Sequence, residues 1–421
     1  MYLTLLIALN ELLFMLSIGG FFMYKIMAVN AGSSSLKFQL FEMPSEKLIC
    51  KGICERIGHV DGKFTIKGEN EVFEKDTILP IMDHAVAVQI VIDAMLKYKV
   101  VESLEEIQGI GHRIVQGGKY FSDSVLFDDY AEKKIEELIT LAPLHNGPHL
   151  IGFRAFKKLL PNVKNVAVFD TAFHQTMAPV DYMFPVPYEW YEKYDIRRYG
   201  AHGTSHKYLY GEALKYLDKK DDIKIITCHL GSGSSITAIK DGKCVATSMG
   251  LTPLGGIMMG TRCGDIDPSV VTYACEKTGK TPAEIFQILN KCSGFKGVSD
   301  GKDDSRDVIA DMEEGDERAK LANDLFVRRV CDFIGQYYVR LGGCDMIIFS
   351  AGIGENAGYY RDRICKELEP SLGTKLNQDQ MDLRGVDALI STSDSKIKVA
   401  VIPTNEELMI ARDTVRILNL K

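Results

Sequence analysis

Apolar and polar residues follow two different patterns along the chain, and the two patterns predict different elements. Short apolar runs that end in glycine-rich or polar turns predict strands, at residues 26–29, 107–114, 165–169, 223–228, 346–349 and 398–402. Apolar residues spaced three or four positions apart predict helices, at residues 84–98, 129–141, 149–160, 265–279, 282–291, 317–341 and 406–418. Strands mixed with helices over the whole length indicate an α/β fold.

The first predicted strand leads into a polar turn that suits an anion. Residues 30–37 read Asn-Ala-Gly-Ser-Ser-Ser-Leu-Lys, and the alternating run 38–41 predicts a second strand. Small residues let backbone N–H groups approach a phosphate, the hydroxyls of Ser33 and Ser35 can donate to it, and Lys37 adds a positive charge. No Walker A motif occurs, and a strand rather than a helix follows. A serine-rich hairpin turn without a ligand is the alternative interpretation.

A second unit of the same kind lies at residues 230–235, which read Leu-Gly-Ser-Gly-Ser-Ser between two apolar runs. Two such hairpins suggest a duplicated domain with a nucleotide in the cleft between the copies. The change of domain is expected near residues 170–173. We therefore predict an N-terminal domain of residues 23–172 plus 406–421, and a nucleotide-binding C-terminal domain of residues 173–405.

Composition and charge narrow the class of protein. Of the 421 residues, 46% are hydrophobic and 25% are charged, as in soluble globular proteins. The formal net charge of −7, with no long basic block, argues against nucleic acid as a partner. The ten cysteines include no C-x-x-C pair and no zinc pattern. Reduced thiols in a cytoplasmic enzyme fit this usage best.

Residues 1–22 differ from the rest because residues 3–22 are almost wholly apolar. The stretch lacks the basic start and the cleavage site of a signal peptide, although it is long enough to span a bilayer. Gly19 and Gly20 can be encoded by a bacterial ribosome-binding sequence shortly before Met23. We therefore expect residues 1–22 to be a non-native leader or extension. A membrane anchor and an ordered extra helix are the alternatives, and a membrane partner is not expected.

Polar residues at the ends of predicted strands are candidates for chemistry. Asp170 ends the run 165–169, and ligands bind outside the carboxyl ends of strands in open α/β sheets. Asn30 and Glu406 are oxygen donors at the ends of two other strands and suit Mg²⁺, which takes few protein ligands. Arg113 lies between an apolar strand and two glycines, which favours an anion clamp. Asp170 as a cap and Arg113 as a solvated charge are the plain alternatives.

Two glycine-containing segments carry further candidates. His202 and the residues after it read His-Gly-Thr-Ser-His, which indicates either an anion site or a helix start capped by Thr204 or Ser205. Arg262 lies in a glycine-rich segment, so a turn rather than a free helix face would hold it. Asp267, before a proline, is interpreted as a helix cap.

Five segments in this order resemble those of the acetate kinase family. They are Asn-Ala-Gly-Ser-Ser-Ser-Leu-Lys at 30–37, Phe-Asp-Thr-Ala-Phe-His-Gln-Thr-Met at 169–177, Arg-Tyr-Gly-x-His-Gly-Thr-Ser-His at 198–206, Met-Gly-Thr-Arg-x-Gly-Asp-Ile-Asp-Pro at 259–268 and Pro-Thr-Asn-Glu-Glu-Leu at 403–408. The resemblance covers residues 23–421. It implies the acetate and sugar kinase/actin fold, with two ribonuclease-H-like domains and the active site in the interdomain cleft.

The resemblance also implies a homodimer and an activity: reversible phosphoryl transfer between ATP and acetate, giving ADP and acetyl phosphate, with Mg²⁺ or in its place Mn²⁺. Its catalytic positions correspond to Asp170, His202 and Arg262. Its substrate positions correspond to Arg113, Val115, Leu144 and Pro253, and its metal positions to Asn30 and Glu406. Its nucleotide positions correspond to Ser33, Ser35, Lys37, His229, Leu230, Gly231, Ser232, Gly233, Asp304, Ser305, Arg306, Gly352, Ile353, Gly354, Glu355 and Asn356.

The chain departs from the family pattern at four positions. Ser232 replaces an asparagine in a nucleotide segment, Gly255 replaces a glutamate, and Ser305 replaces an apolar residue. Ala201 replaces a phenylalanine of the acyl methyl pocket. One more buried methylene stabilises binding by about 0.8 kcal/mol, so we expect Ala201 to improve the use of propionate.

A propionate kinase of the same fold is the nearest alternative function. A non-catalytic nucleotide switch of the actin or chaperone type is a remote one. Three cations in the cleft argue against the switch, because a scaffold would not require them.

Overall fold

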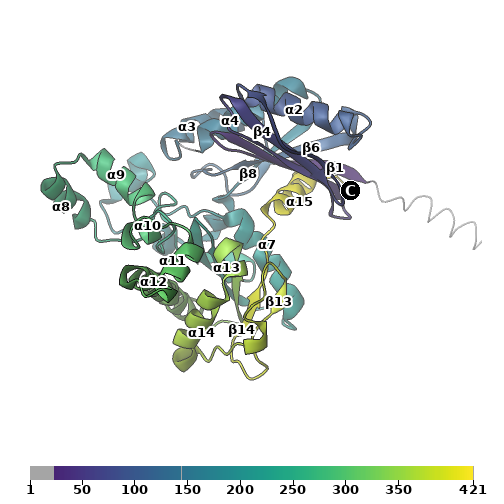
Figure 1. Cartoon of the computed structure of the whole chain (residues 1–421). Helices are drawn as coiled ribbons and strands as arrows, with labels where there is room; N and C mark the ends of the chain where they lie inside the picture. The colour runs from purple at the N-terminus through teal and green to yellow at the C-terminus, as the bar shows by residue number, and fades with distance from the viewer. Residues whose placement is uncertain (1–22, 144, 421) are drawn as a thin grey trace, which may run out of the picture.

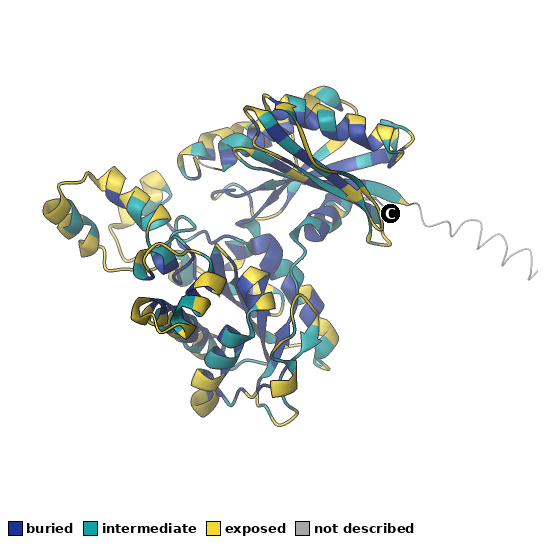
Figure 2. Cartoon of the chain, in the orientation of Figure 1, coloured by how far each residue is buried: buried dark blue, intermediate teal, exposed yellow. Residues whose placement is uncertain are grey.

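A computed structural model describes residues 23–143 and 145–420. The predictions made for residues 1–22 and for Leu144 lie outside the described residues. Two β-sheets build two halves of the molecule, one above the other in Figure 1. The burial colours of Figure 2 show that the inner strands and the helix faces against them form the cores.

The first sheet has eight strands. Its spatial order is β5 (Val72–Ile81), β4 (His59–Gly68), β3 (Lys47–Glu55), β2 (Ser35–Met43), β1 (Tyr24–Ala31), β6 (Ile107–Ile114), β8 (Lys164–Phe169) and β7 (Val125–Leu126). Strand β1 pairs antiparallel with β2 and parallel with β6, and β6 pairs parallel with β8. The carboxyl ends of β1, β6 and β8 therefore meet at one edge of the sheet.

The second sheet repeats this arrangement. Its order is β11 (Lys243–Thr247), β10 (Ser234–Lys240), β9 (Lys224–Leu230), β12 (Met346–Ser350), β14 (Lys398–Val401) and β13 (Ala388–Leu389). Strand β9 pairs antiparallel with β10 and parallel with β12, as β1 does with β2 and β6. The two Gly/Ser turns therefore occupy corresponding places in the two sheets. The predicted duplicated α/β fold is confirmed.

Helices cover both faces of the first sheet. Successive residues of a strand point to opposite faces, so Met27 and Val29 of β1 pack with α2 (His84–Lys97) and α4 (Asn146–Leu159), while Ile26 and Ala28 pack with α15 (Glu406–Leu418). Helix α3 (Asp129–Glu137) packs beside α4. The last helix thus returns to the first sheet, as Figure 1 shows by its yellow colour.

A glycine of β6 makes the close approach of α15 possible. A Cβ atom on Gly111 would lie 2.3 Å from Oγ1 of Thr414 and 2.4 Å from a side-chain carbon of Ile410. Any side chain at this position would therefore push α15 away from the sheet.

The second sheet lies between α7 (Gly203–Ala213) on one face and a larger helical layer on the other. Leu209 and Ala213 of α7 pack against Ile225 and Met346. On the opposite face, α12 (Glu317–Leu341) and α14 (Gly358–Leu372) form the largest apolar cluster of the molecule with the strands. The remaining helices are α5 (Pro179–Tyr182), α6 (Tyr188–Tyr194), α8 (Ser269–Thr278), α9 (Pro282–Lys291), α10 (Gly294–Val298), α11 (Ser305–Glu313) and α13 (Ala351–Asn356).

Several elements differ from the sequence predictions. The helix predicted from residue 265 begins at Ser269, because Asp267 Oδ1 accepts a hydrogen bond from the Ser269 N–H at 2.8 Å. The N-cap of this helix is Pro268, so the interpretation of Asp267 as the cap is wrong by one position, although its carboxylate binds the first N–H of the helix. Strands β3–β5 and helices α11 and α14 were not predicted, and α7 was only one of two alternatives given for the segment that begins at His202. Within residues 23–143 and 145–420, no helix combines the length and the apolar composition needed to cross a bilayer.

Candidate active site

A buried ion pair joins the ends of two parallel strands. Arg113 near the end of β6 and Asp170 just after β8 are brought together by the pairing of Ile114 with Phe169. Nε of Arg113 lies 3.0 Å from Oδ1 of Asp170, and Nη2 lies 2.7 Å from Oδ2. Burial opposes the charge of Arg113, but Asp170 and Glu406 outweigh it and raise its pKa. Since Asp170 binds Nε and Nη2, Nη1 of Arg113 is the nitrogen left to hold an anion.

Glu406 extends from the first turn of α15 toward this pair. Asn405 caps the helix by accepting from the Leu408 N–H at 3.0 Å. Among the described residues, Oε1 of Glu406 is buried without a hydrogen-bond partner. Burial raises the pKa of Glu406 to about 7, with Arg113 opposing the shift and Asp170 adding to it. A buried carboxylate with too little positive charge around it is suited to a cation.

Asn30 adds an oxygen at the same edge of the sheet. It lies one residue before the end of β1, opposite Lys37 of β2, and β1 also contacts α15. Two or three protein oxygens suit Mg²⁺, which keeps several of its waters. The described residues contain no group of three or more His, Cys, Asp or Glu side chains that could hold a metal. Carboxylate and amide oxygens are donors that suit Mg²⁺ and Mn²⁺.

His202 faces these groups from the other half of the molecule. Its backbone is left-handed, with φ of 57°, and it directly precedes α7. Its ring stacks on that of His229, with centroids 4.1 Å apart. The suggested cap is wrong: Thr204 and Ser205 lie inside the helix, and the Thr204 hydroxyl has no hydrogen-bond partner among the described residues.

Arg262 lies beside His202 at the second Gly/Ser turn. A Cβ atom on Gly233 would be 3.3 Å from Nη1 of Arg262 and 3.5 Å from Nε2 of His202, so both groups border the same small volume. Arg262 donates to the Pro253 carbonyl at 3.3 Å, and no carboxylate of the described chain pairs with it. Burial lowers its pKa. An unpaired, half-buried cation is a ready partner for an anion.

His145 belongs to the same cluster and was missed by the sequence analysis. It precedes α4, and burial lowers its pKa, with further contributions from the charges of Arg113, Asp170 and Arg262. All three charges therefore act on its ring. The signal available in the sequence was a histidine and an asparagine before Gly147-Pro148 at a helix start.

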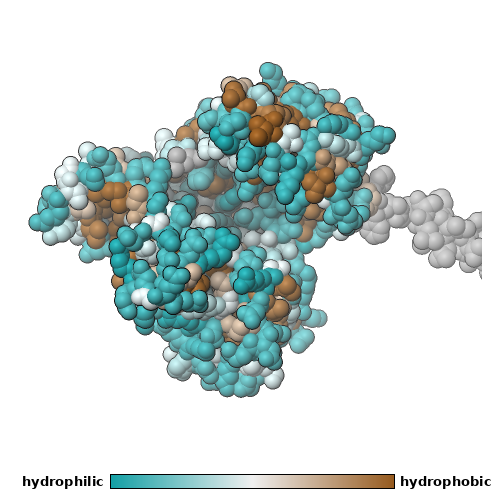
Figure 3. Space-filling view, viewed as in Figure 1, coloured by the Kyte–Doolittle hydropathy of each residue, from teal (hydrophilic) through white to brown (hydrophobic). Residues whose placement is uncertain are grey.

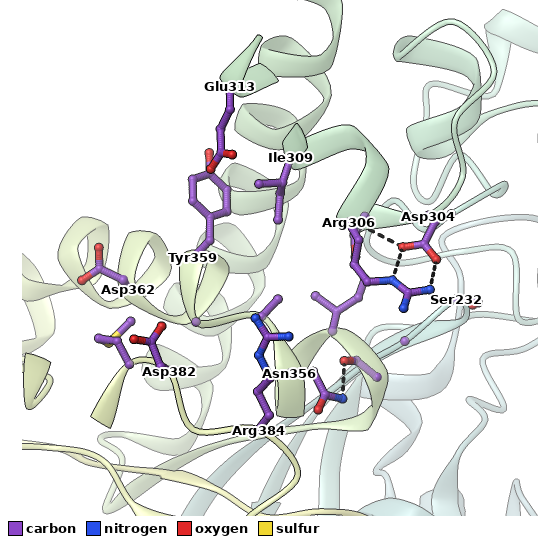
Figure 4. A pocket seen from close by; sticks show the side chains of 18 of the residues that line it. Ser232, Asp304, Arg306, Ile309, Glu313, Asn356, Tyr359, Asp362, Asp382 and Arg384 are labelled. Atoms are coloured by element: carbon purple, nitrogen blue, oxygen red, sulfur yellow. Dashed lines mark hydrogen bonds and ion pairs between the residues drawn. The ribbon is translucent and has the colours of Figure 1, made fainter. Parts of the chain in front are cut away.

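A cavity of about 930 Å³ opens in the second half (Figure 4). Asp304 and Arg306 from the start of α11, Asn356 from α13, and Arg384 extend around it. Arg306 is bound to Asp304 through Nε at 3.0 Å and Nη2 at 2.6 Å, and this contact lowers the pKa of Asp304 to about 2. The size of the cavity is suited to a nucleotide-sized ligand.

The predicted nucleotide segments divide into residues that border this cavity and residues that do not. Those bordering it are Gly231, Ser232, Asp304, Ser305, Arg306, Gly352, Ile353 and Asn356. Leu230 is fully buried in the apolar core, and Gly354 packs against the backbone of Phe349. Glu355 accepts hydrogen bonds from the Ala351 and Thr404 N–H groups, so its carboxylate is directed at the protein.

The turn after β1 holds the remaining predicted phosphate contacts. Lys37 and Ser33 are exposed, Ser35 is half-buried, and the Gly32 N–H donates to the Ser35 carbonyl at 2.7 Å. The side chains of Ser33 and Lys37 are thus accessible to a ligand. Figure 3 shows a hollow between the two halves of the molecule. Of the predicted acyl-pocket residues, Val115 is buried and Pro253 is half-buried beside Arg262.

Comparison with known proteins points to the same family as the sequence motifs. Residues 25–412 match the Acetokinase family. The chain belongs to this family. It is 51% identical over 399 residues to the acetate kinase of Bacillus cytotoxicus and 50% identical over 396 residues to that of Bacillus subtilis; each match covers 94% of this chain and 100% of the relative.

Solved structures of family members have the same fold. The acetate kinase of Porphyromonas gingivalis is 41% identical, with a TM-score of 0.88, and a propionate kinase of Francisella tularensis is 41% identical, with a TM-score of 0.87. Each match covers 94% of this chain and 100% of the other. The acetate and sugar kinase/actin fold expected from the motifs is therefore confirmed.

Proposed function

We propose that this acetokinase-family chain transfers a phosphoryl group reversibly between ATP and acetate, giving ADP and acetyl phosphate. The observation that carries the proposal is the identity of 50–51% to acetate kinases over their whole length. Two arginines add to it: Arg113, which is paired with Asp170 but has Nη1 left over, and Arg262, which has no carboxylate partner among the described residues. The chain is accordingly a phosphotransferase, and the non-catalytic switch is set aside.

The side chains of the site suit direct in-line transfer. Nη1 of Arg113 would hold the acetate carboxylate, which is a competent nucleophile and needs no general base. Arg262 and His202 would stabilise the charge that develops on the transferred group, since phosphoryl transfer depends mainly on positioning and electrostatics. Asp170 would keep the Arg113 guanidinium in place.

Asn30 and Glu406 would hold Mg²⁺, or Mn²⁺ in its place. The unpartnered Oε1 of Glu406 supports this assignment. The metal would supply neutralisation of phosphate charge. The adenine nucleotide would lie in the 930 Å³ cavity, with its phosphates directed toward Gly233, Ser33, Ser35 and Lys37.

The division into domains is part of the proposal. Residues 23–172 plus 406–421 would form one domain and residues 173–405 the other. The packing of α15 on β1 and β6 supports assigning the end of the chain to the first domain.

We also propose a homodimer in the cytoplasm. Helix α8 has no buried residue, and Val270, Tyr273 and Phe286 are 43%, 62% and 46% exposed. Apolar residues gather over this region in Figure 3. A second copy of the chain would cover them. All ten cysteines are free, which suits a reducing compartment. Sedimentation of wild type and Tyr273→Glu tests the dimer.

Propionate is the second candidate substrate. Ala201 is buried with Met249 and Met259 next to His202, and its side chain is smaller than the phenylalanine of the family pattern. The similarity of the chain to a propionate kinase from Francisella tularensis supports this second candidate. Hydroxamate detection of acyl phosphate from ATP and acetate, propionate or butyrate tests both candidates. Absence of product from every acid would refute the proposed function.

A further inference from the structure

A chain of four hydrogen-bonding side chains extends from His202 into the core. Nδ1 of His202 lies 2.9 Å from Oγ of Ser235, and the same Oγ lies 2.8 Å from Nε2 of His206. Nδ1 of His206 lies 2.7 Å from Oγ1 of Thr227. His206, Ser235 and Thr227 are all fully buried. The described structure thus connects the cleft to the middle of strand β9.

Both histidines of this chain are neutral near pH 7. Burial lowers the pKa of His202 and of His206 well below the usual range, and the neighbouring His229, with a pKa of about 3, is neutral as well. A neutral imidazole carries one proton, on either Nδ1 or Nε2. Either ring nitrogen of His202 can therefore carry the proton. In the structure, the hydrogen-bond network indicates which nitrogen does so.

The network allows two directions, because each hydroxyl has a single proton to donate. In the first, Thr227 donates to His206, His206 donates through Nε2 to Ser235, and Ser235 donates to Nδ1 of His202. Nε2 of His202 then presents an N–H to the cleft. In the second direction every proton is reversed, the Thr227 hydroxyl is left with the Thr237 carbonyl at 3.4 Å, and Nε2 of His202 presents a lone pair.

We propose that Ser235, His206 and Thr227 are positioning residues that hold His202 in the tautomer with its proton on Nε2. The proposal rests on the proposed function, since an anionic phosphoryl group beside Nε2 and Arg262 is stabilised by an N–H and repelled by a lone pair. The first direction also places every hydroxyl proton on a contact of 2.9 Å or less. Histidines with a fixed partner on one nitrogen commonly owe their tautomer to it.

The test combines nitrogen NMR with kinetics on matched variants. The ring nitrogens of His202, assigned by their loss in His202→Asn, report the tautomer of the ¹⁵N-labelled full chain with Mg²⁺ and a nonhydrolysable ATP analogue. Thr227→Val removes the far hydroxyl of the chain without changing side-chain shape. Thr237→Val is the matched control, because Thr237 pairs with Thr227 across the strands, is equally buried, and its hydroxyl contacts Thr247 and no histidine.

Wild type is expected to carry the proton of His202 on Nε2. Ser235→Ala and Thr227→Val should leave a histidine of the chain without its partner, loosen the hold on the His202 ring and lower kcat by about 10–100-fold, as loss of a second partner does for other functional histidines. KM for acetate and for ATP should change by less than about twofold, since the histidine acts on the transferred group. Ser248→Ala removes another fully buried serine hydroxyl, one that binds the Ile236 N–H, and should leave kcat and the tautomer unchanged.

A proton on Nδ1 of wild-type His202 would overturn the proposal, and so would a Thr227→Val variant with wild-type kcat. Should Ser235→Ala fail to fold, Thr227→Val decides alone, because valine fits the space of threonine. A wild-type chain that phosphorylates no short-chain acid refutes the proposed function instead, and the NMR spectrum still reports the tautomer.

Discussion

Arg113 binds both carboxylate oxygens of Asp170 from a position on the adjacent strand, so the cation that we propose to bind substrate is held in place by the protein itself. Asp170 is buried and Arg113 is half-buried, with side-chain exposures of 1% and 19%. An arginine without this partner would have many rotamers to lose on binding. Asp170 therefore acts by fixing the direction of Arg113.

Replacing one partner of the Arg113–Asp170 pair should destabilise the protein more than the pair itself stabilises it. Arg113→Met and Asp170→Asn should each destabilise the protein by about 3–5 kcal/mol, because each leaves one buried group unpaired. The double variant should cost clearly less than the sum of the two. Urea unfolding of the four proteins measures the coupling. Additive costs would show that the two side chains do not stabilise one another.

Arg262→Ala should lower kcat by about 10³-fold, the scale on which kinases and GTPases depend on such an arginine. Its thermal unfolding midpoint should hardly change, because Arg262 has no carboxylate partner among the described residues and only long contacts, to the Pro253 carbonyl at 3.3 Å and to Sδ of Met259 at 3.7 Å. Steady-state kinetics and calorimetry on the same preparation test both parts. A loss below tenfold would contradict the role in catalysis.

Glu406 should make stability depend on pH when metal is absent. Its folded pKa of about 7 lies above the ordinary value of 4.5. The folded state therefore binds the proton more tightly, so this contribution is fully present below about pH 4.5 and is lost as the pH rises to about 7. Across that range, Glu406→Gln should gain on the order of 3 kcal/mol relative to wild type in EDTA. The free energies of unfolding at about pH 5 and about pH 8 measure this gain.

Mg²⁺ supplies the control for that experiment. Bound next to Glu406, it should restore wild-type stability at the higher pH and leave Glu406→Gln unaffected. If Mg²⁺ changed the stability of wild type and of Glu406→Gln equally, Glu406 would not be a metal ligand.

Ala201→Phe should shift the choice of acid toward acetate. A bulkier side chain beside His202 removes space for one methylene, so the ratio of kcat/KM for propionate to that for acetate should fall roughly fourfold. The thermal midpoint serves as control, because Ala201 is 2% exposed and packs with Met249 and Met259. If the folded variant kept the wild-type ratio of kcat/KM values, Ala201 would not determine the choice between propionate and acetate.

Ends of apolar runs were the most informative part of the sequence. Asn30, Arg113 and Asp170 follow or end short apolar strands, and parallel pairing then brings such ends to one edge. The duplicated hairpins were also recognisable, since both turns have the same small residues. Strands β3–β5 were missed because their half-exposed faces leave only a weak alternation.

The parts that depend on contacts across the fold could not be predicted. Ser235 and Thr227 look like ordinary buried strand residues, and only the register of β9 with β10 and the position of α7 connect them to His202. Glu355 was grouped with the nucleotide residues by its place in a glycine-rich segment, whereas its contacts are to the backbone of Ala351 and Thr404. His145 precedes a helix and ends no predicted strand, so the pattern that singled out Asn30, Arg113 and Asp170 did not apply to it.

The return of α15 to the first sheet has a consequence for synthesis on the ribosome. The apolar residues Ile26, Ala28, Val166 and Val168 emerge early, yet the side chains that cover them, from Leu408 to Ala411, are made almost last. During nearly the whole of translation one face of the first sheet thus lacks its cover. The half of the molecule that is translated first is completed last, and Glu406 joins the site in the same step.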